Sequence, residues 1–133
     1  MKQRRKKQQQ RYRHIGKRSV YMKKIEIITR PEKLEELKAL LDSHKVGGMS
    51  VLNIMGCGNQ KGIIKRYRGG EMKVNFLPKI RVETIVADED VDSIIEDVLD
   101  ELQTGEVGDG KIAITDVGEL IRVRTGERGN DAL

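Results

Sequence analysis

The sequence has few aromatic side chains. Its 133 residues include no tryptophan, one phenylalanine and three tyrosines, so the core of the fold must be built from aliphatic side chains. Domains that bind single-stranded nucleic acid commonly stack bases on exposed aromatic rings. The composition therefore disfavours this class of protein.

Cysteine and long apolar runs are also scarce. The single cysteine, Cys57, excludes an internal disulfide and fits a reducing compartment. No apolar run approaches the roughly 20 residues of a membrane-spanning helix, and no apolar segment follows the basic N-terminus as a signal peptide would require. We expect a soluble, cytoplasmic protein without membrane insertion, and one domain with a core.

Acidic residues are absent from residues 1–21, which hold nine lysines or arginines. Residues 22–133 hold seventeen basic and twenty-one acidic residues, a net charge of −4, so the basicity of the chain belongs to its N-terminal extension. We expect this extension to be disordered, and to be an arm for nucleic acid or an acidic surface, or a tail without a role. A third hypothesis, which we favour, is that Met22 is the true start. The codons of residues 17–19 can contain a bacterial ribosome-binding sequence at a suitable distance.

The apolar pattern of residues 22–133 predicts four main strands and two helices. Leucines at helical spacing follow Pro31, a residue that suits the first turn of a helix. A second apolar stripe runs from Val91 to Leu102, and the acidic cluster at residues 88–90 favours a helix start there through capping and the helix dipole. Alternating apolar residues predict strands over residues 23–28, 49–55, 80–86 and 110–117, with a short fifth strand over 120–124.

This order of elements predicts an α+β fold of the ferredoxin-like, or split βαβ, type. Such a fold has an antiparallel sheet with two helices on one face, which leaves the other face uncovered. Because apolar residues occur on both faces of the predicted strands, we expect further copies of the chain to cover the open face in a closed homo-oligomer. The strand pattern by itself does not distinguish a dimer from a trimer.

Two connecting segments have unusual features. Residues 56–79 join the second and third strands, and a connection longer than about 12–15 residues is usually functional or disordered. The charged centre of this segment and its glycine-rich and proline-containing ends predict a mobile loop on fixed hinges. Residues 103–111, QTGEVGDGK, place three glycines within six residues, which indicates a tight turn or a close approach of the backbone to a ligand. The segment is either an anion-binding loop that ends in a lysine or an ordinary helix-to-strand connection.

Six segments together resemble the PII nitrogen-regulatory signal-transduction proteins, across residues 22–133. In chain order they are MKKIEIITRPEKLEELK, GCGNQKG, YRGGE, NFLPK, QTGEVGDGKI and IRVRTGE. The resemblance implies a ferredoxin-like homotrimer with a T-loop at about residues 57–76 and a B-loop at about residues 103–111. It also implies that ATP and ADP compete for clefts between subunits, and that 2-oxoglutarate binds there together with Mg²⁺ and ATP. The T-loop would dock on a client, which is a transporter of ammonium or another nitrogen compound, a nitrogen-metabolism enzyme or a regulator.

The resemblance assigns phosphate contacts to the B-loop and to the C-terminal arginines. The backbone of the B-loop, at Gly108, Asp109 and Gly110, would wrap the nucleotide phosphates. Lys111 would add positive charge, as would Arg122 and Arg124 from across the subunit boundary. On the predicted fifth strand these two arginines point to the same side. Without the resemblance, two arginines on the solvated face of an edge strand are equally expected.

Five further positions match family contacts for nucleotide, metal and 2-oxoglutarate, with one substitution. Ser50 and Gly58 fall where the family contacts nucleotide. Gln60 falls where a glutamine ligates Mg²⁺ and orients 2-oxoglutarate, and Lys79 where a lysine pairs with the far carboxylate of that ligand. Asn59 stands where many relatives have an arginine that contacts the γ-phosphate. We expect the loss of this charge to weaken the preference for ATP over ADP. A sensor of adenylates alone is therefore the alternative.

The T-loop carries the residues expected to contact the client. Its basic character favours an acidic docking surface on the partner, with a solvated loop as the alternative. Met72 and Gly70 occupy the positions where relatives carry a modified tyrosine and serine, so we expect a sensor that is switched by ligands alone. The residues expected to contact the client are Lys65, Arg66, Tyr67, Arg68, Glu71 and Met72.

Two other classes of function are weaker matches. A nucleic-acid-binding module would use the basic extension, but the acidic domain and the lack of aromatic residues on the strands oppose it. An enzyme is not expected, because the two histidines, His14 and His44, form no catalytic constellation with Cys57 or a serine.

Overall fold

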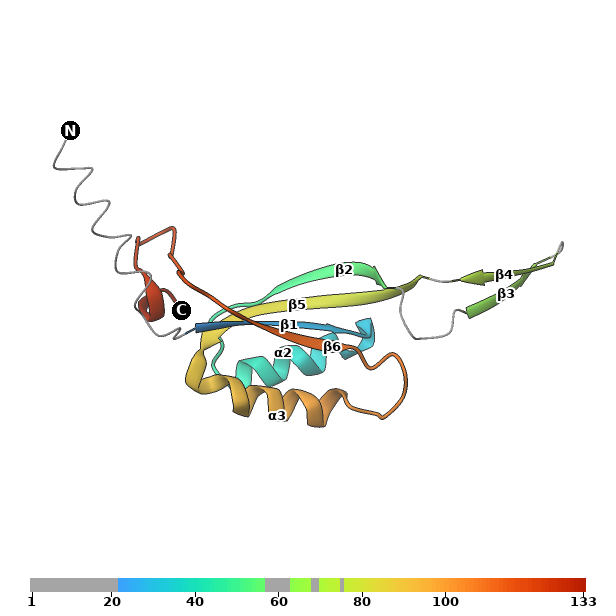
Figure 1. Cartoon of the computed structure of the whole chain (residues 1–133), viewed down its shortest axis with the longest axis horizontal. Helices are drawn as coiled ribbons and strands as arrows, with labels where there is room; N and C mark the ends of the chain where they lie inside the picture. Colours follow the sequence, from blue (N-terminus) through green and yellow to red (C-terminus); the bar gives the residue numbers. More distant parts are fainter. Residues whose placement is uncertain (1–21, 57–62, 68–69, 75) are drawn as a thin grey trace, which may run out of the picture.

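The four main strands predicted from the sequence form one antiparallel sheet (Figure 1). The computed structural model describes residues 22–56, 63–67, 70–74 and 76–133. The sheet has the order β2-β5-β1-β6, which is the strand order of the ferredoxin-like fold and confirms the predicted fold class. Its strands are β1 (Met22–Thr29), β2 (Ser50–Gly56), β5 (Leu77–Ala87) and β6 (Lys111–Asp116).

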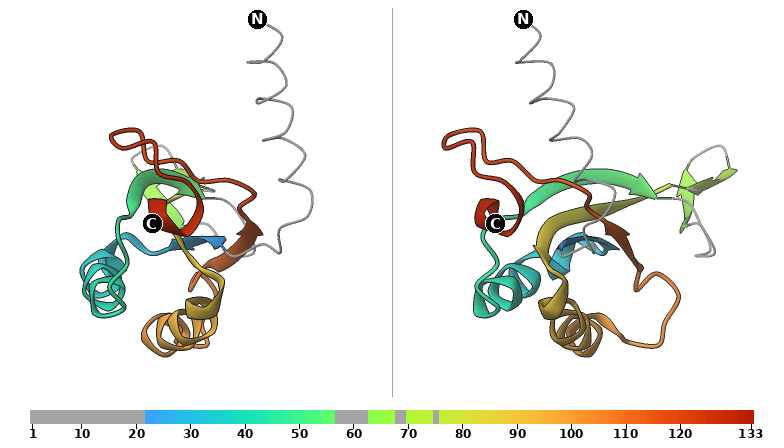
Figure 2. Two further views of the ribbon diagram at one scale, coloured as in Figure 1. Left: turned by 90° about the vertical axis from the view of Figure 1, so that its left-hand side faces the viewer. Right: turned by 60° about the vertical axis from the view of Figure 1, so that its left-hand side comes forward.

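Both helices pack on the same face of this sheet (Figure 2). α2 (Leu34–Ser43) follows the 3-10 turn η2 (Pro31–Lys33), and α3 (Val91–Leu102) follows the 3-10 turn η3 (Asp88–Asp90). Their apolar stripes and the inward side chains of β1 and β5 form an aliphatic core, in which each buried side chain contributes on the order of 1.5–3 kcal/mol. The buried core residues are Ile25, Ile27, Leu37, Leu41, Ile80, Val82, Val86, Val91, Ile94, Val98 and Leu102.

The acidic cluster before α3 does not cap the helix through a side chain, so the capping part of that prediction is wrong. Asp90 precedes α3 without a side-chain cap hydrogen bond. The backbone N–H of Val91 bonds instead to the carbonyl oxygen of Asp88, within the preceding 3-10 turn. A backbone donor at the start of the helix is thus satisfied without a carboxylate.

The opposite face of the sheet is open in the described part of the chain. Leu52 on this face is 39% exposed, and Met55, on the other face of the edge strand β2, is 64% exposed, so apolar residues occur on both faces as predicted. Glu26 of β1 lies directly opposite Glu83 of β5, a pairing that repels. Arg81 compensates, because its Nε lies 3.4 Å from Glu26 Oε1 and 3.1 Å from Glu83 Oε1.

The centre of the predicted T-loop contains regular structure that the sequence analysis did not predict. β3 (Ile63–Tyr67) and β4 (Gly70–Val74) form an antiparallel hairpin, which extends beyond the ends of β2 and β5 (Figure 1). The register pairs Lys65 with Met72 and Arg66 with Glu71. The segment was predicted as a mobile loop, and no strands were assigned to it. The pairing of the two strands satisfies their backbone polar groups.

The predicted fifth strand does not form. Residues 120–124 contribute one isolated bridge, between Ile121 and Arg128, and the chain then turns. Backbone hydrogen bonds from Arg122 to Glu127 (2.9 Å) and from Gly126 to Arg122 (2.7 Å) close this turn on itself, so the segment does not extend the sheet. None of the helices in the described residues is long and apolar enough to cross a membrane.

Candidate functional site

The site residues predicted in the described part of the domain lie mainly in two regions, at opposite ends of the main sheet (Figure 1). One region is the loop between α3 and β6, which contains the predicted B-loop residues. The other is a pocket beside the C-terminal segment, which contains Ser50 and Arg122. Both regions use residues of β1 and β5, taken from opposite ends of these strands.

The carboxylate of Asp109 organises the B-loop from inside. Asp109 Oδ2 accepts hydrogen bonds from the backbone N–H groups of Thr104 (2.7 Å) and Gly105 (3.0 Å). Asp109 Oδ1 accepts from the Thr104 hydroxyl at 2.5 Å. These bonds tie the start of the loop to its end. The Thr104 hydroxyl, followed by the Arg30 guanidinium and the Thr104 backbone, holds the pKa of Asp109 well below its usual range.

Arg30, at the junction of β1 and η2, fixes the outer part of the loop. Its Nη1 lies 2.7 Å from Asp109 Oδ1, and its Nη2 donates to the carbonyl oxygen of Val107 at 3.1 Å. The planar guanidinium therefore grips the residues on both sides of Gly108.

Two further bonds fasten the B-loop to the ends of β1 and β5. The hydroxyl of the buried Thr29 donates to the carbonyl oxygen of Asp109 at 2.8 Å. Lys79 Nζ donates to the carbonyl oxygen of Gly108 at 3.0 Å. These residues reach the same loop because Thr29 pairs with Ile80, the neighbour of Lys79, in the sheet.

Gly110 lies against the backbone of β1. Its φ is +113°, and a Cβ added to it would lie 1.8 Å from the carbonyl oxygen of Ile28. A glycine is required here both by the conformation and by the space. The next residue, Lys111, opens β6 opposite Ile28 and is exposed.

The B-loop leaves backbone donors available. Among the described residues, no acceptor takes a hydrogen bond from the N–H groups of Gly108 and Gly110. The N–H of Asp109, between them, bonds to the carbonyl oxygen of Glu106 at 3.4 Å. Two free backbone N–H groups beside a lysine favour an anion. The loop therefore presents two backbone donors and a lysine that could face an anion, and a Cβ at Gly110 would destroy its fit to β1.

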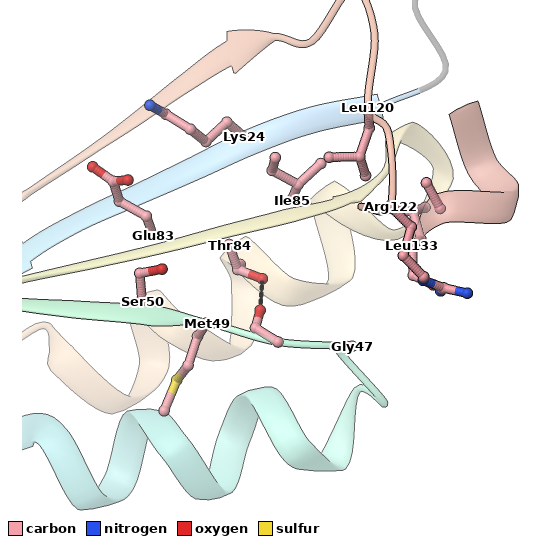
Figure 3. Close-up of a pocket in the computed structure, with 12 residues that line it drawn as sticks. Lys24, Gly47, Met49, Ser50, Glu83, Thr84, Ile85, Leu120, Arg122 and Leu133 are labelled. Atoms are coloured by element: carbon pink, nitrogen blue, oxygen red, sulfur yellow. Dashed lines mark hydrogen bonds between the residues drawn. The ribbon is translucent and has the colours of Figure 1, made fainter. Parts of the chain in front are cut away.

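The pocket at the other end of the sheet has a volume of about 490 Å³ (Figure 3). The open face of the sheet supplies Lys24, Glu83, Ile85 and Ser50, since Ser50 pairs with Glu83 and Lys24 pairs with Ile85. The C-terminal segment supplies a second wall. The lining residues are Lys24, Gly47, Gly48, Met49, Ser50, Glu83, Thr84, Ile85, Leu120, Arg122, Ala132 and Leu133.

One buried hydrogen bond holds the glycine-rich edge of the pocket. Thr84 is 4% exposed and donates from Oγ1 to the carbonyl oxygen of Gly48 at 2.6 Å, drawn as a dashed line in Figure 3. The lining mixes apolar side chains with the carboxylate of Glu83 and the cations of Lys24 and Arg122. Such a mixed lining suits a small polar ligand. The volume falls within the range of roughly 300–1,000 Å³ that small-molecule sites occupy.

The two C-terminal arginines are not equivalent, contrary to the predicted strand alternation. Arg122 lines the pocket, and its Nη2 donates to the carbonyl oxygen of Leu133 at 2.7 Å while its Nη1 lies 3.3 Å from Glu127 Oε1. Arg124 is an exposed turn residue outside the pocket lining. The alternation fails because these residues form a turn and not a strand.

The remaining predicted site residues belong to the segment between β2 and β5. Gly58, Asn59, Gln60 and Arg68 lie outside the described residues. Lys65, Arg66 and Tyr67 lie on β3, and Glu71 and Met72 lie on β4. Within the described residues no group of three or more histidine, cysteine and acidic side chains could hold a metal ion.

Four residues of the two regions were not predicted from the sequence: Arg30 and Thr104 at the B-loop, and Glu83 and Thr84 at the pocket. The signal for Thr104 was present, because a threonine before a glycine-rich turn commonly bonds to the backbone of that turn. Arg30 gave no local signal, since its partner Asp109 is 79 residues away. Glu83 also gave no signal, because polar residues alternate with apolar ones along its strand and nothing distinguished it from the others.

Comparison with known proteins assigns the chain to a family. The family model "Nitrogen regulatory protein P-II" matches residues 22–127. The chain belongs to the PII nitrogen-regulatory protein family. It is 46% identical over 114 residues to nitrogen regulatory protein P-II 2 of Methanothermobacter thermautotrophicus, a match that covers 86% of this chain and 99% of the relative.

Solved PII structures share the fold. The B. subtilis GlnK–ATP complex superimposes with a TM-score of 0.70 at 34% identity, covering 87% of this chain and 99% of that one. Arabidopsis thaliana PII bound to citrate gives a TM-score of 0.69 at 32% identity, covering 86% and 94%. The chain is thus a PII signalling protein, and residues 1–21 lie outside the family match.

Proposed function

We propose that this PII protein is a homotrimeric sensor of adenine nucleotides, in which each site combines the pocket of one subunit with the B-loop of its neighbour. The observation that carries the proposal is the separation of the two regions at opposite ends of one sheet (Figure 1). The pocket offers walls for a base, and the B-loop offers backbone donors for phosphates. A ring of three chains brings one end of each subunit to the other end of the next.

The open sheet face supports assembly. It combines the exposed Leu52 with the compensated charges of Glu26, Arg81 and Glu83, a pattern suited to burial against another copy of the same face. The likeness to the B. subtilis GlnK–ATP complex supports ATP as a ligand. ADP would compete with ATP for the same site.

A complementation experiment tests the shared site. Arg122→Gln removes a pocket cation and Lys111→Gln removes a loop cation, and each homotrimer should bind ADP weakly by calorimetry. Trimers are then co-assembled from equal amounts of both variants. In about one site in four, the intact pocket of a Lys111→Gln chain meets the intact loop of an Arg122→Gln chain. Tight binding should return at that fraction of sites. A mixture that binds no better than its two components would mean that each chain binds nucleotide alone or not at all.

We further propose that 2-oxoglutarate binds with Mg²⁺ and ATP, next to Lys79 and Gln60. The citrate-bound Arabidopsis relative supports a carboxylate ligand in this family. Lys79 supplies a cation beside the B-loop, and Mg²⁺ would be held by Gln60 and phosphate oxygens. Mg²⁺ would supply charge neutralisation between the phosphates and the carboxylates.

Calorimetry distinguishes the two kinds of sensor. Heat from 2-oxoglutarate only in the presence of Mg-ATP would support a carbon and nitrogen sensor. Saturable ADP and ATP binding without any 2-oxoglutarate heat would support the adenylate-only alternative, and the test would then be Asn59→Arg, which restores the charge found in many relatives.

The output of the sensor is proposed to be regulatory and not catalytic. The T-loop hairpin would dock on a transporter of ammonium or another nitrogen compound, on a nitrogen-metabolism enzyme or on a regulator. Since Gly70 and Met72 lack hydroxyl groups, ligands alone would control docking, in the cytoplasm. Intact-mass spectra of protein from nitrogen-starved and nitrogen-replete cells should show no added nucleotidyl or phosphoryl group, and a mass shift located in the T-loop would contradict this.

A further inference from the structure

We propose that Arg30 is a positioning residue that sets the direction of the B-loop donors, and that Asp109 is its partner and not a direct ligand of nucleotide or metal. The inference rests on the proposed function, because it names the device that shapes the phosphate side of that site. Neither residue contacts the pocket at the other end of the sheet.

Arg30 is a fixed anchor. Its backbone continues directly from the last residue of β1, has extended dihedral angles (φ −66°, ψ 140°), and precedes Pro31. Its carbonyl oxygen accepts the N–H of Lys33 at 3.1 Å, which closes the turn of η2. The guanidinium therefore extends from a rigid point of the sheet, whereas the residues that it holds belong to a loop.

The carboxylate of Asp109 is filled by contacts within the protein. It accepts four hydrogen bonds, from Arg30, from the Thr104 hydroxyl and from the backbone N–H groups of Thr104 and Gly105. A carboxylate offers about four lone-pair sites, so none remains for a metal ion. Its charge would also repel phosphate, and the Arg30 guanidinium neutralises it at 2.7 Å.

The consequence for the backbone follows from the planarity of the peptide bond. In a trans peptide unit the carbonyl oxygen and the next N–H point in opposite directions. Arg30 holds the carbonyl of Val107, so the N–H of Gly108 points away from Arg30. Thr29 holds the carbonyl of Asp109, so the N–H of Gly110 points away from the end of β1. These are the two donors left available for an anion.

Lys79 holds the peptide carbonyl that lies between the two held by Arg30 and Thr29. Its Nζ holds the carbonyl of Gly108, the middle of the three successive carbonyls. All three carbonyl oxygens, of Val107, Gly108 and Asp109, are thus turned toward protein donors. Without Arg30 the first peptide unit would be free to rotate, and a carbonyl oxygen could then face the anion.

The test uses the full-length chain and the variants Arg30→Gln, Asp109→Asn and the double variant. Lys33→Gln is the matched control, because it removes one positive charge from the same segment, where Lys33 faces Glu101 and not the B-loop. Circular dichroism first establishes that each variant is folded. Arg30→Lys is the conservative variant, since it keeps the charge but loses the two-point grip.

The first readout is amide hydrogen exchange at Thr104 and Gly105 in nucleotide-free protein. We expect faster exchange in Arg30→Gln and Asp109→Asn, a smaller change in Arg30→Lys, and none in Lys33→Gln. Unchanged exchange in Arg30→Gln would overturn the positioning role, whatever the nucleotide affinity.

The second readout is the Kd of ADP and of Mg-ATP. Arg30→Gln should weaken both ligands by the same factor, about tenfold, because the loop and not one phosphate is affected. The double variant should lose less affinity than the sum of the two single losses, since both changes remove the Arg30–Asp109 pair. A loss confined to ATP, or additive losses, would instead make Arg30 a phosphate ligand and overturn the proposal. If the wild-type chain bound neither adenylate, the proposed function would be wrong, and the exchange readout would still decide whether Arg30 positions the loop.

Discussion

Replacement of Gly110 by alanine tests the close contact between the B-loop and β1. The added Cβ would lie 1.8 Å from the carbonyl oxygen of Ile28, and 3.0 Å from the Cα of Thr29. Both are backbone atoms of a central strand, so no side-chain rotation can relieve the overlap. Gly105→Ala is the matched control, because Gly105 also has a positive φ (+83°) but open space around its Cβ position.

The expected magnitudes differ for a physical reason. Gly105→Ala should lower the free energy of unfolding by about 1–2 kcal/mol, because alanine is disfavoured in the left-handed region. Gly110→Ala should have the same effect and a second one. Its Cβ either overpacks against β1, which typically costs about 1–3 kcal/mol, or moves the loop away from that strand. Movement would break the hydrogen bond from Thr29 to the Asp109 carbonyl and loosen the grip of Arg30. We therefore expect a loss of about 3 kcal/mol or more in Gly110→Ala.

Urea unfolding of both variants at one protein concentration measures the difference, because an oligomer has a concentration-dependent stability. ADP titrations of the folded variants should show that Gly110→Ala loses more affinity than Gly105→Ala. If the two variants differed by less than about 0.5 kcal/mol, with equal slopes in urea, the loop would not be held against β1 as described.

Three further predictions concern the core, the pocket and the B-loop carboxylate. Ile94→Ala removes a fully buried side chain and should cost about 2–5 kcal/mol in urea unfolding, whereas Leu99→Ala, at 45% exposure, should cost less than about 1 kcal/mol. Thr84→Val leaves the Gly48 carbonyl without its donor, so the free energy of unfolding should fall by about 1–3 kcal/mol. ADP should also bind more weakly. An unchanged ADP affinity would mean that the glycine-rich edge of the pocket does not contribute to the nucleotide site. The lowered pKa of Asp109 means that its carboxylate stabilises the fold above the unfolded-state pKa of about 4 and loses that effect as the pH falls toward the folded-state value. The destabilisation by Asp109→Asn should therefore be constant above about pH 5 and shrink toward pH 2, and a pH-independent difference would contradict the ionic network.

The elements that pack the core were predictable from the sequence because burial imposes a period on the chain. Ile25 and Ile27 alternate into the core of the sheet, and the stripe from Val91 to Leu102 places its residues against the same core. Periodicity did not predict the burial of every residue. Leu99 belongs to the apolar stripe but is 45% exposed. Burial depends on what packs against a position, which periodicity does not contain.

The elements without a core could not be predicted in the same way. Ile121 and Val123 alternate with arginines as in a strand, yet Val123 is 98% exposed in a turn closed by local hydrogen bonds. The hairpin of β3 and β4 had a signal that the sequence analysis left unused. Tyr67 pairs with Gly70, so only two residues separate the strands, a spacing and glycine content typical of tight hairpins.

The B-loop was recognisable from its glycines, but its shape was not. The shape depends on Arg30 and Thr29, which lie about eighty residues earlier in the chain, and on Lys79. Only the pairing of Thr29 with Ile80 brings these side chains to one place. Long-range register of this kind follows from the completed sheet and not from any local pattern.

The position of Lys79 connects the B-loop with the segment proposed to contact the client. Lys79 lies on β5 two residues after Leu77, which pairs with Gly56 at the end of β2, so the T-loop leaves and rejoins the sheet beside this lysine. In the structure Lys79 holds the carbonyl of Gly108. A carboxylate ligand that drew the ammonium group away would free that carbonyl and add a charge at the base of the T-loop in the same step. If nucleotide and 2-oxoglutarate bind as proposed, they would act on the T-loop through its base on β2 and β5, and not through contacts along the hairpin. Lys79→Met should accordingly weaken ADP binding, because the Gly108 carbonyl loses its donor, and should abolish the effect of 2-oxoglutarate on T-loop amide exchange. A retained effect of 2-oxoglutarate would place the coupling elsewhere.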